Sequence, residues 1–177
     1  MSSEVQEFII FFMGIIGSAF FSGSEAALIS IPSKRIKQLM EDYPKSRSAF
    51  IFLSERPSEL LTTILIGNNF INIFVASLAT TIAQRYFAGD AIPYSVGITT
   101  LLILIFGEII PKTFMRNHSE RMVVPVIRTL QLFYFLLYPV VFFFMFIIKL
   151  VLGEHASLQE KMITKGDIEF MVGEAEK

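Results

Sequence analysis

Four long stretches of the chain are almost free of charged residues. They cover residues 8–31, 60–84, 92–111 and 122–148. The second contains no charged residue, and each of the others contains one: Glu25 in the first, Glu108 in the third and Arg128 in the fourth. A bilayer core about 30 Å thick is crossed by about 20 apolar helical residues. All four stretches are therefore long enough to cross a membrane, and we expect at least three of them to be transmembrane helices.

Two short helices are predicted between the first and second stretches. Pro32 and Ser33 open the first, which should stop before Pro44, and the second should run from about Lys45 to Arg56, where Pro57 stops it. Both have an apolar face, formed by Ile36, Leu39 and Met40 in the first and by Phe50 and Leu53 in the second. The stretch before them has no basic start and no cleavage site, so we interpret it as a mature span and not as a signal peptide.

The fourth stretch allows two interpretations. It carries Arg128 near its start, Pro125 and Pro139 as kink points, and many Phe and Tyr residues. Aromatic and basic residues suit the membrane interface. We favour a kinked juxtamembrane helix, and the alternative is a fourth full span.

Lys and Arg residues predict the orientation. The segment before the first span has none, whereas the loop after it has Lys34, Arg35, Lys37, Lys45, Arg47 and Arg56. The third span is followed by Lys112, Arg116 and Arg121. Because basic loops stay inside, we expect the N terminus outside and the C terminus in the cytoplasm of a multi-pass protein of the cell (inner) membrane.

Composition then excludes several classes of protein. Only 18% of the 177 residues are charged, against about a quarter in soluble domains. The absence of Cys excludes a disulfide scaffold and a thiol nucleophile, and the net charge of −1 argues against a nucleic-acid partner. His118 and His155 lie outside the apolar stretches, and neither HExxH nor GxSxG occurs, so we do not expect an enzyme.

Polar residues inside the spans fall on particular helix faces. Gly14, Ser18, Ser22 and Glu25 share one face of the first span, and Asn68 and Asn72 share a face of the second. In the third, the run from Gly107 to Pro111 is expected to break the helix. At about 1.5 Å per residue, Ser22, Asn68 and Glu108 come to similar depths, somewhat inside the midplane.

These groups are oxygen ligands, which suit a hard cation such as Mg²⁺, and Na⁺ could use the same atoms. Structural interpretations exist for most of them: Ser24 and Ser30 could bond their own helix, and the Asn residues could join helices. Glu25 could simply border the interface. Glu108 is harder to explain structurally, because a carboxylate in a membrane segment is costly. Lys112 could be the partner of Glu108 or an anchor at the cytosolic end.

Three motifs together resemble one family. They are Ser18-Ala-Phe-Phe-Ser22-Gly-Ser-Glu25-Ala-Ala-Leu28, Gly67-Asn-Asn-Phe-Ile-Asn72 and Gly107-Glu-Ile-Ile-Pro-Lys112. In this order and spacing they resemble the transmembrane domain of the CorB/CorC proteins and the cyclin-M (CNNM) transporters. The resemblance runs over about residues 5–152.

The resemblance implies an all-α membrane fold with three transmembrane helices, short cytosolic helices and a juxtamembrane helix, assembled in the bilayer as a homodimer. It also implies Mg²⁺ export, exchanged for Na⁺. Carried over by motif, the metal ligands would be Ser18 or Ser22, Asn68 and Glu108, with Asn72, Glu25 and the Gly107 carbonyl as weaker candidates. The animal members lack an acid at the position of Glu25.

Family members continue into a cytosolic CBS-domain pair that binds ATP. We therefore expect residues 1–152 to form the transmembrane domain, and residues 153–177, where Thr164 and Asp167 resemble a helix cap, to begin a linker truncated before that pair. The alternative to a transporter is a Mg²⁺-sensing membrane scaffold that binds the ion, moves none and regulates another transporter. Ion flux would distinguish the two.

Overall fold

The computed structural model describes residues 3–86 and 91–152, which are helical throughout apart from short connections. The helices are α1 (Ser3–Ser30), α2 (Ser33–Asp42), η1 (Pro44–Ser46), α3 (Arg47–Glu55), α4 (Pro57–Tyr86), α5 (Ala91–Leu102), η2 (Ile103–Ile109), α6 (Ile110–Asn117) and α7 (Ser119–Leu152). No strand occurs in this part of the chain. The predicted all-α membrane fold is confirmed. The linker predicted from residue 153 onward, including Thr164 and Asp167, lies outside the described residues.

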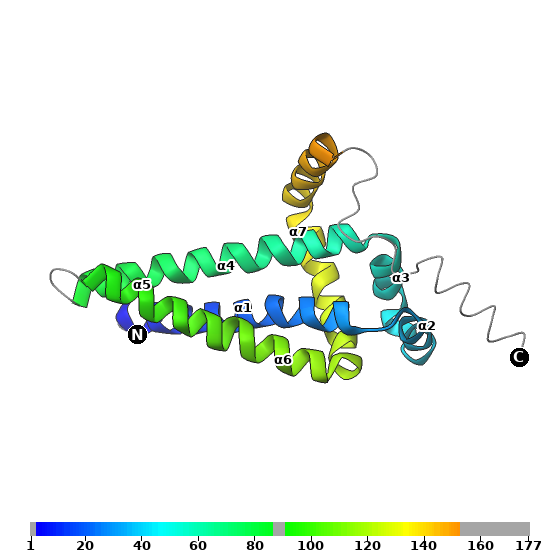
Figure 1. Ribbon diagram of the computed structural model, residues 1–177, viewed down its shortest axis with the longest axis horizontal. Coiled ribbons are helices and arrows are strands. Elements are labelled where there is room, and N and C mark those ends of the chain that lie inside the picture. The colour runs from blue at the N-terminus through cyan, green and yellow to red at the C-terminus, as the bar shows by residue number, and fades with distance from the viewer. Residues whose placement is uncertain (1–2, 87–90, 153–177) are drawn as a thin grey trace, which may run out of the picture. The chain divides into compact units, whose positions relative to one another are not determined.

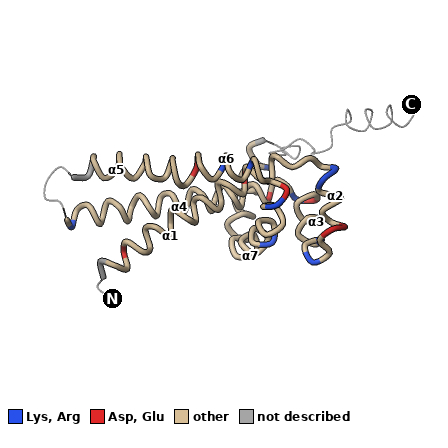
Figure 2. The backbone as a smooth tube through the Cα atoms, turned by 90° about the horizontal axis from the view of Figure 1, so that it is seen from below, with Lys and Arg blue, Asp and Glu red and all other residues tan. Residues whose placement is uncertain are grey.

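Within the described residues, four helical segments are long and apolar enough to cross a membrane. They are Val5–Ser30, Pro57–Tyr86, Pro93–Asn117 and Ser119–Val151, which correspond to the four apolar stretches of the sequence. In Figure 2, α1, α4 and α5 are almost entirely uncharged, whereas α2 and α3 carry many charged residues. The chain is therefore a multi-pass membrane protein.

The chain divides into two compact units, of which the first comprises Met1–Ser30 and Ile64–Val123. In it, α1, the greater part of α4 and the α5–η2–α6 segment run side by side (Figure 1). Its buried apolar cluster comes from all three segments: Phe11 and Ile15 of α1, Val75 and Ala79 of α4, and Ile103 of η2. At one end of α4, Arg85 forms an ion pair with Glu7 of α1, 2.7 Å away. The candidate ligands Ser18, Ser22, Asn68, Asn72 and Glu108 all belong to this unit.

The second unit comprises Ile31–Thr63 and the chain from Val124 onward. The two short helices end close to where Pro44 and Pro57 were expected to stop them. Ile36 and Leu39 of α2 and Phe50 and Leu53 of α3 are buried, which confirms the predicted apolar faces. Met40 is only partly buried.

Helix α7 continues through both internal prolines, Pro125 and Pro139, and its yellow and orange parts run in different directions (Figure 1). Two contacts orient it against the first turns of α4: Tyr134 bonds to Glu59, and Thr62 donates to the sulfur of Met145 at 3.5 Å. Between these contacts α7 rises about 16 Å but α4 only about 5 Å. The middle of α7 therefore crosses the first turns of α4 instead of running along them, which favours the juxtamembrane interpretation.

Candidate functional site

Helix α1 presents two buried hydroxyls, one turn apart, to its neighbours. Ser18 and Ser22 are both 0% exposed. The Ser18 hydroxyl donates to the Gly107 carbonyl at 3.5 Å, the outer limit for a hydrogen bond. A Cβ atom on Gly107 would lie 2.7 Å from that hydroxyl, so only glycine allows η2 to approach α1 so closely.

Helix α4 contributes the amides of Asn68 and Asn72, which are also one turn apart. The Asn72 side-chain nitrogen donates to a Glu108 carboxylate oxygen at 3.1 Å. Since Glu108 directly follows Gly107, this bond and the bond from Ser18 place α1, α4 and η2 around one point. Four residues of the ligand set carried over by motif, Ser18, Asn72, Gly107 and Glu108, therefore lie close together.

The helix that carries Glu108 does not break where the sequence predicted a break. It widens into a π-helical turn over Ile103–Ile109, in which the N–H of Ile110 reaches back five residues to the Ile105 carbonyl. Pro111 follows, and it has no N–H to offer the Gly107 carbonyl four residues earlier. The helix thus stays continuous, while the Gly107 carbonyl lacks its ordinary α-helical donor. Single π-turns occur frequently at functional sites.

A second close approach places Ser22 and Asn68 at one level. The buried ring of Phe21 packs on Gly67, where a Cβ atom would lie 2.5 Å from the ring carbons. Phe21 precedes Ser22 and Gly67 precedes Asn68, so these two polar residues lie at the same height on α1 and α4. This level is one turn from that of Ser18 and Asn72, on the same helices.

Several oxygens of this cluster are buried without a hydrogen bond. Within residues 3–86 and 91–152, the buried side-chain oxygens that lack a partner are those of Ser22, Asn68 and Asn72, together with Ser46 of the second unit. Buried polar atoms are normally hydrogen-bonded, and an unsatisfied one costs about 1–3 kcal/mol. The three oxygens of the first unit, one of them on the residue that bonds to Glu108, are a set of unused electron-pair donors.

Glu25 lies apart from this cluster. Its carboxylate pairs with the Lys112 ammonium at 3.1 Å, and the two side chains are 40% and 38% exposed. The suggestion that Lys112 pairs with Glu108 is therefore wrong: Lys112 belongs to α6, which packs against α1 and so brings Lys112 to Glu25. Glu108 keeps only the amide of Asn72 as a described partner.

Other polar residues of the spans have ordinary structural roles. The hydroxyls of Ser24 and Ser30 donate to carbonyls of their own helix at 2.6 Å, as the structural interpretation expected. The Asn69 amide likewise donates within α4, to Leu65 at 2.8 Å. Asn72 does join two helices through its nitrogen, but its oxygen stays without a partner.

The chemical character of the cluster is uniform: one carboxylate, two amide oxygens, two hydroxyls and a backbone carbonyl. All are oxygens, the ligand type of hard cations such as Mg²⁺ and Na⁺. The described part of the chain has no group of three or more His, Cys, Asp or Glu residues that could hold a metal ion. Any ion in this cluster would thus be bound largely by neutral groups.

Comparison with known proteins adds independent evidence. The family model described as the cyclin M transmembrane N-terminal domain (CNNM) matches residues 8–177. The chain belongs to this family. A relative from Haemophilus influenzae, named as a UPF0053 protein, is 32% identical to this CNNM domain over 171 residues, which are 95% of this chain and 41% of that protein.

Two further relatives have informative names. The UPF0053 inner membrane protein YfjD of Escherichia coli is 30% identical over 108 residues, which are 61% of this chain and 25% of that protein. The metal transporter cnnm-4 of Caenorhabditis elegans is 33% identical over 107 residues, 58% of this chain and 23% of that protein. This CNNM domain thus spans less than half the length of these relatives.

One polar cluster of this CNNM domain was missed by sequence reasoning. Glu59, in the first turn of α4, accepts a hydrogen bond from the Tyr134 hydroxyl and pairs with Arg56 at 3.4 Å. The Glu59 carboxylate raises the pKa of the Arg56 guanidinium above its ordinary value. Because Tyr134 lies 75 residues from Glu59 in the sequence, no local sequence pattern predicts their contact.

Proposed function

We propose that this chain is the membrane domain of a magnesium transporter that holds dehydrated Mg²⁺ between α1, α4 and η2. The observation that carries the proposal is the group of buried, unpartnered oxygens of Ser22, Asn68 and Asn72, together with the bond from the Asn72 amide to the Glu108 carboxylate. Mg²⁺ requires about six oxygens in a near-ideal octahedron. Because these three oxygens make no hydrogen bond within the protein, they could bind a cation without breaking one.

The ligands we propose are the Glu108 carboxylate, the amide oxygens of Asn68 and Asn72, and the Ser22 hydroxyl. The Ser18 hydroxyl and the Gly107 carbonyl complete a set of six, because their mutual bond is long and easily exchanged for bonds to an ion. We leave Glu25 out of the ligand set, because Lys112 neutralises it.

The transport cycle that we propose is Mg²⁺ export in exchange for Na⁺, by a homodimer with its N terminus outside and its C terminus in the cytoplasm. The relative that is named a metal transporter supports the class of substrate. Na⁺ is a suitable counter-ion because it binds the same oxygens less strongly. The activity moves an ion and changes no covalent bond, so no enzymatic step is proposed.

Flux measurements test this function. The purified protein is reconstituted in liposomes with a Mg²⁺-sensitive dye and an imposed Na⁺ gradient. We expect Na⁺-dependent Mg²⁺ flux that Glu108→Gln abolishes, because the variant loses the one charged ligand. Mg²⁺ binding without flux, in wild-type protein, would instead support the sensing scaffold.

A further inference from the structure

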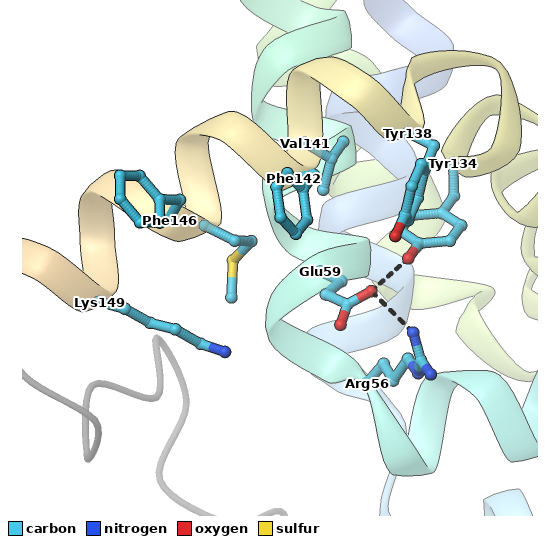
Figure 3. A pocket seen from close by; sticks show the side chains of 9 residues that line it. Arg56, Glu59, Tyr134, Tyr138, Val141, Phe142, Phe146 and Lys149 are labelled. Carbon is cyan, nitrogen blue, oxygen red and sulfur yellow. Dashed lines mark hydrogen bonds and ion pairs between the residues drawn. The ribbon is translucent and has the colours of Figure 1, made fainter.

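The second unit contains a cavity of about 260 Å³ between the first turn of α4 and the second half of α7. Its polar wall includes Arg56, Glu59 and Lys149, and its apolar wall includes Val141, Phe142 and Phe146 (Figure 3). We propose that this cavity binds an anionic phospholipid, with the phosphate between Arg56 and Lys149 and one acyl chain along the apolar wall. The proposal does not depend on the proposed ion binding by the first unit.

The charges of the cavity favour a singly charged anion. Glu59 is satisfied, because it accepts from the Tyr134 hydroxyl and pairs with Arg56 at 3.4 Å. Arg56 keeps further N–H groups for a second acceptor. Lys149 is exposed and has no carboxylate partner among the described residues. One carboxylate against two cations leaves a net charge of about +1, which one phosphodiester would balance.

The cations and the apolar wall are arranged as an amphiphile requires. Figure 3 shows Lys149 extending toward the cavity from α7 and Arg56 from the connection between α3 and α4, with Phe142 and Phe146 on the α7 side. Phe142, Phe146 and Lys149 follow i, i+4, i+7 spacing and therefore share one face of α7. Both rings are largely exposed, at 61% and 56%. A free phosphate in water would use the cations alone, whereas a lipid uses the rings as well.

The position of the cavity along α4 corresponds to the level of lipid headgroups. Arg56 directly precedes Pro57, where the apolar span of α4 begins. Basic side chains and aromatic rings gather at this boundary in membrane proteins. The contacts of Tyr134 and Met145 with α4 keep the middle of α7 at the same level. The cavity thus lies at the depth at which the phosphate of a lipid is joined to the beginning of its acyl chains.

Native mass spectrometry of the protein in detergent, with defined lipids added, tests the proposal. We expect wild-type protein to retain phosphatidylglycerol in preference to phosphatidylcholine at equal mole fraction. Lys149→Gln should weaken retention of phosphatidylglycerol about fivefold, which is the effect of one basic residue near a membrane surface. Lys149→Arg should restore it, because the charge returns.

A charge-matched control separates the cavity from general attraction. Lys45→Gln removes an exposed cation of η1 that does not line the cavity, and it should leave retention unchanged. An equal loss in Lys45→Gln would overturn the proposal, as would equal retention of the two lipids by wild-type protein. Complete displacement of the lipid by glycerol phosphate would also overturn it, since it would leave the apolar wall without a role.

Discussion

Ser22 is the residue that most clearly lowers the stability of the ion-free protein while serving the proposed ion binding. Its buried hydroxyl bonds to no described group, so it costs stability in the ion-free protein. We predict that Ser22→Ala leaves the ion-free protein as stable as the wild type, or more stable by about 1 kcal/mol. The same variant should show a smaller rise in unfolding temperature when Mg²⁺ is added, because a ligand that binds more weakly stabilises the folded state less at the same concentration.

Thermal unfolding with EDTA and with Mg²⁺ measures both effects, and Ser24→Ala is the matched control. The Ser24 hydroxyl is also buried, but it donates within its own helix at 2.6 Å. Its loss should leave the response to Mg²⁺ unchanged. An undiminished response in Ser22→Ala would remove Ser22 from the ligand set.

The two membrane carboxylates should differ in the same kind of measurement. We predict that Glu108→Gln strongly weakens Mg²⁺ binding in calorimetry, because the only charged ligand of the cluster is lost. Glu25→Gln should have a much smaller effect, since its charge is already compensated by Lys112 and is 40% exposed. If Glu25→Gln lost as much Mg²⁺ affinity as Glu108→Gln, Glu25 would be as important for binding as Glu108, contrary to this prediction.

At the scale of elements, the approach of η2 to α1 depends on Gly107. A Cβ atom there would lie 2.7 Å from the Ser18 hydroxyl and 3.2 Å from the Ser18 Cβ atom. We predict that Gly107→Ala destabilises the protein by about 1–3 kcal/mol, the usual cost of overpacking. Gly97→Ala is the control: Gly97 of α5 has open space around its would-be Cβ, and alanine there should be neutral or stabilising by up to about 1 kcal/mol.

Chemical or thermal unfolding in detergent compares these two glycine variants. Equal stability of Gly107→Ala and Gly97→Ala would mean that η2 can move away from α1 at little cost. In that case the close approach would not hold the Gly107 carbonyl at the cluster.

Much of the arrangement of elements could be predicted from the sequence, because it depends on local rules. Long apolar runs gave the spans, Pro44 and Pro57 marked the ends of α2 and α3, and four-residue spacing put Ser18 with Ser22 on one face. The partner of Lys112 could not be predicted, because it depends on how α6 packs against α1. The contact of Tyr134 with Glu59 could not be predicted either, because it depends on how α7 packs against α4. For the π-turn, Gly107 and Pro111 predicted an irregularity in the helix but not its type.

At the scale of the whole molecule, the side of the membrane reached by each segment can be measured directly. The chain has no Cys, so a single introduced thiol reacts without background. We predict that Lys45→Cys and Lys149→Cys are both labelled by a membrane-impermeant maleimide only after cells are permeabilised. The reason is that α7 crosses the first turns of α4 and so stays on the side of the basic loop.

A fourth full span would give a different pattern. Lys149→Cys would then be labelled on intact cells, while Lys45→Cys would still require permeabilisation. Labelling of both sites on intact cells would reverse the proposed orientation of the whole domain.

The ion pair of Glu25 with Lys112 also bears on how long a cation could stay. Because Lys112 cancels one acid, a Mg²⁺ ion at Glu108 would meet a single formal negative charge and would remain electrically under-compensated. Binding strength at oxygen sites rises with the number of charged ligands, so a site with one such ligand holds its ion weakly and releases it quickly. A short residence time of the ion would not suit a storage protein. It suits a carrier, because slow dissociation of the ion from its site limits the turnover rate of a carrier.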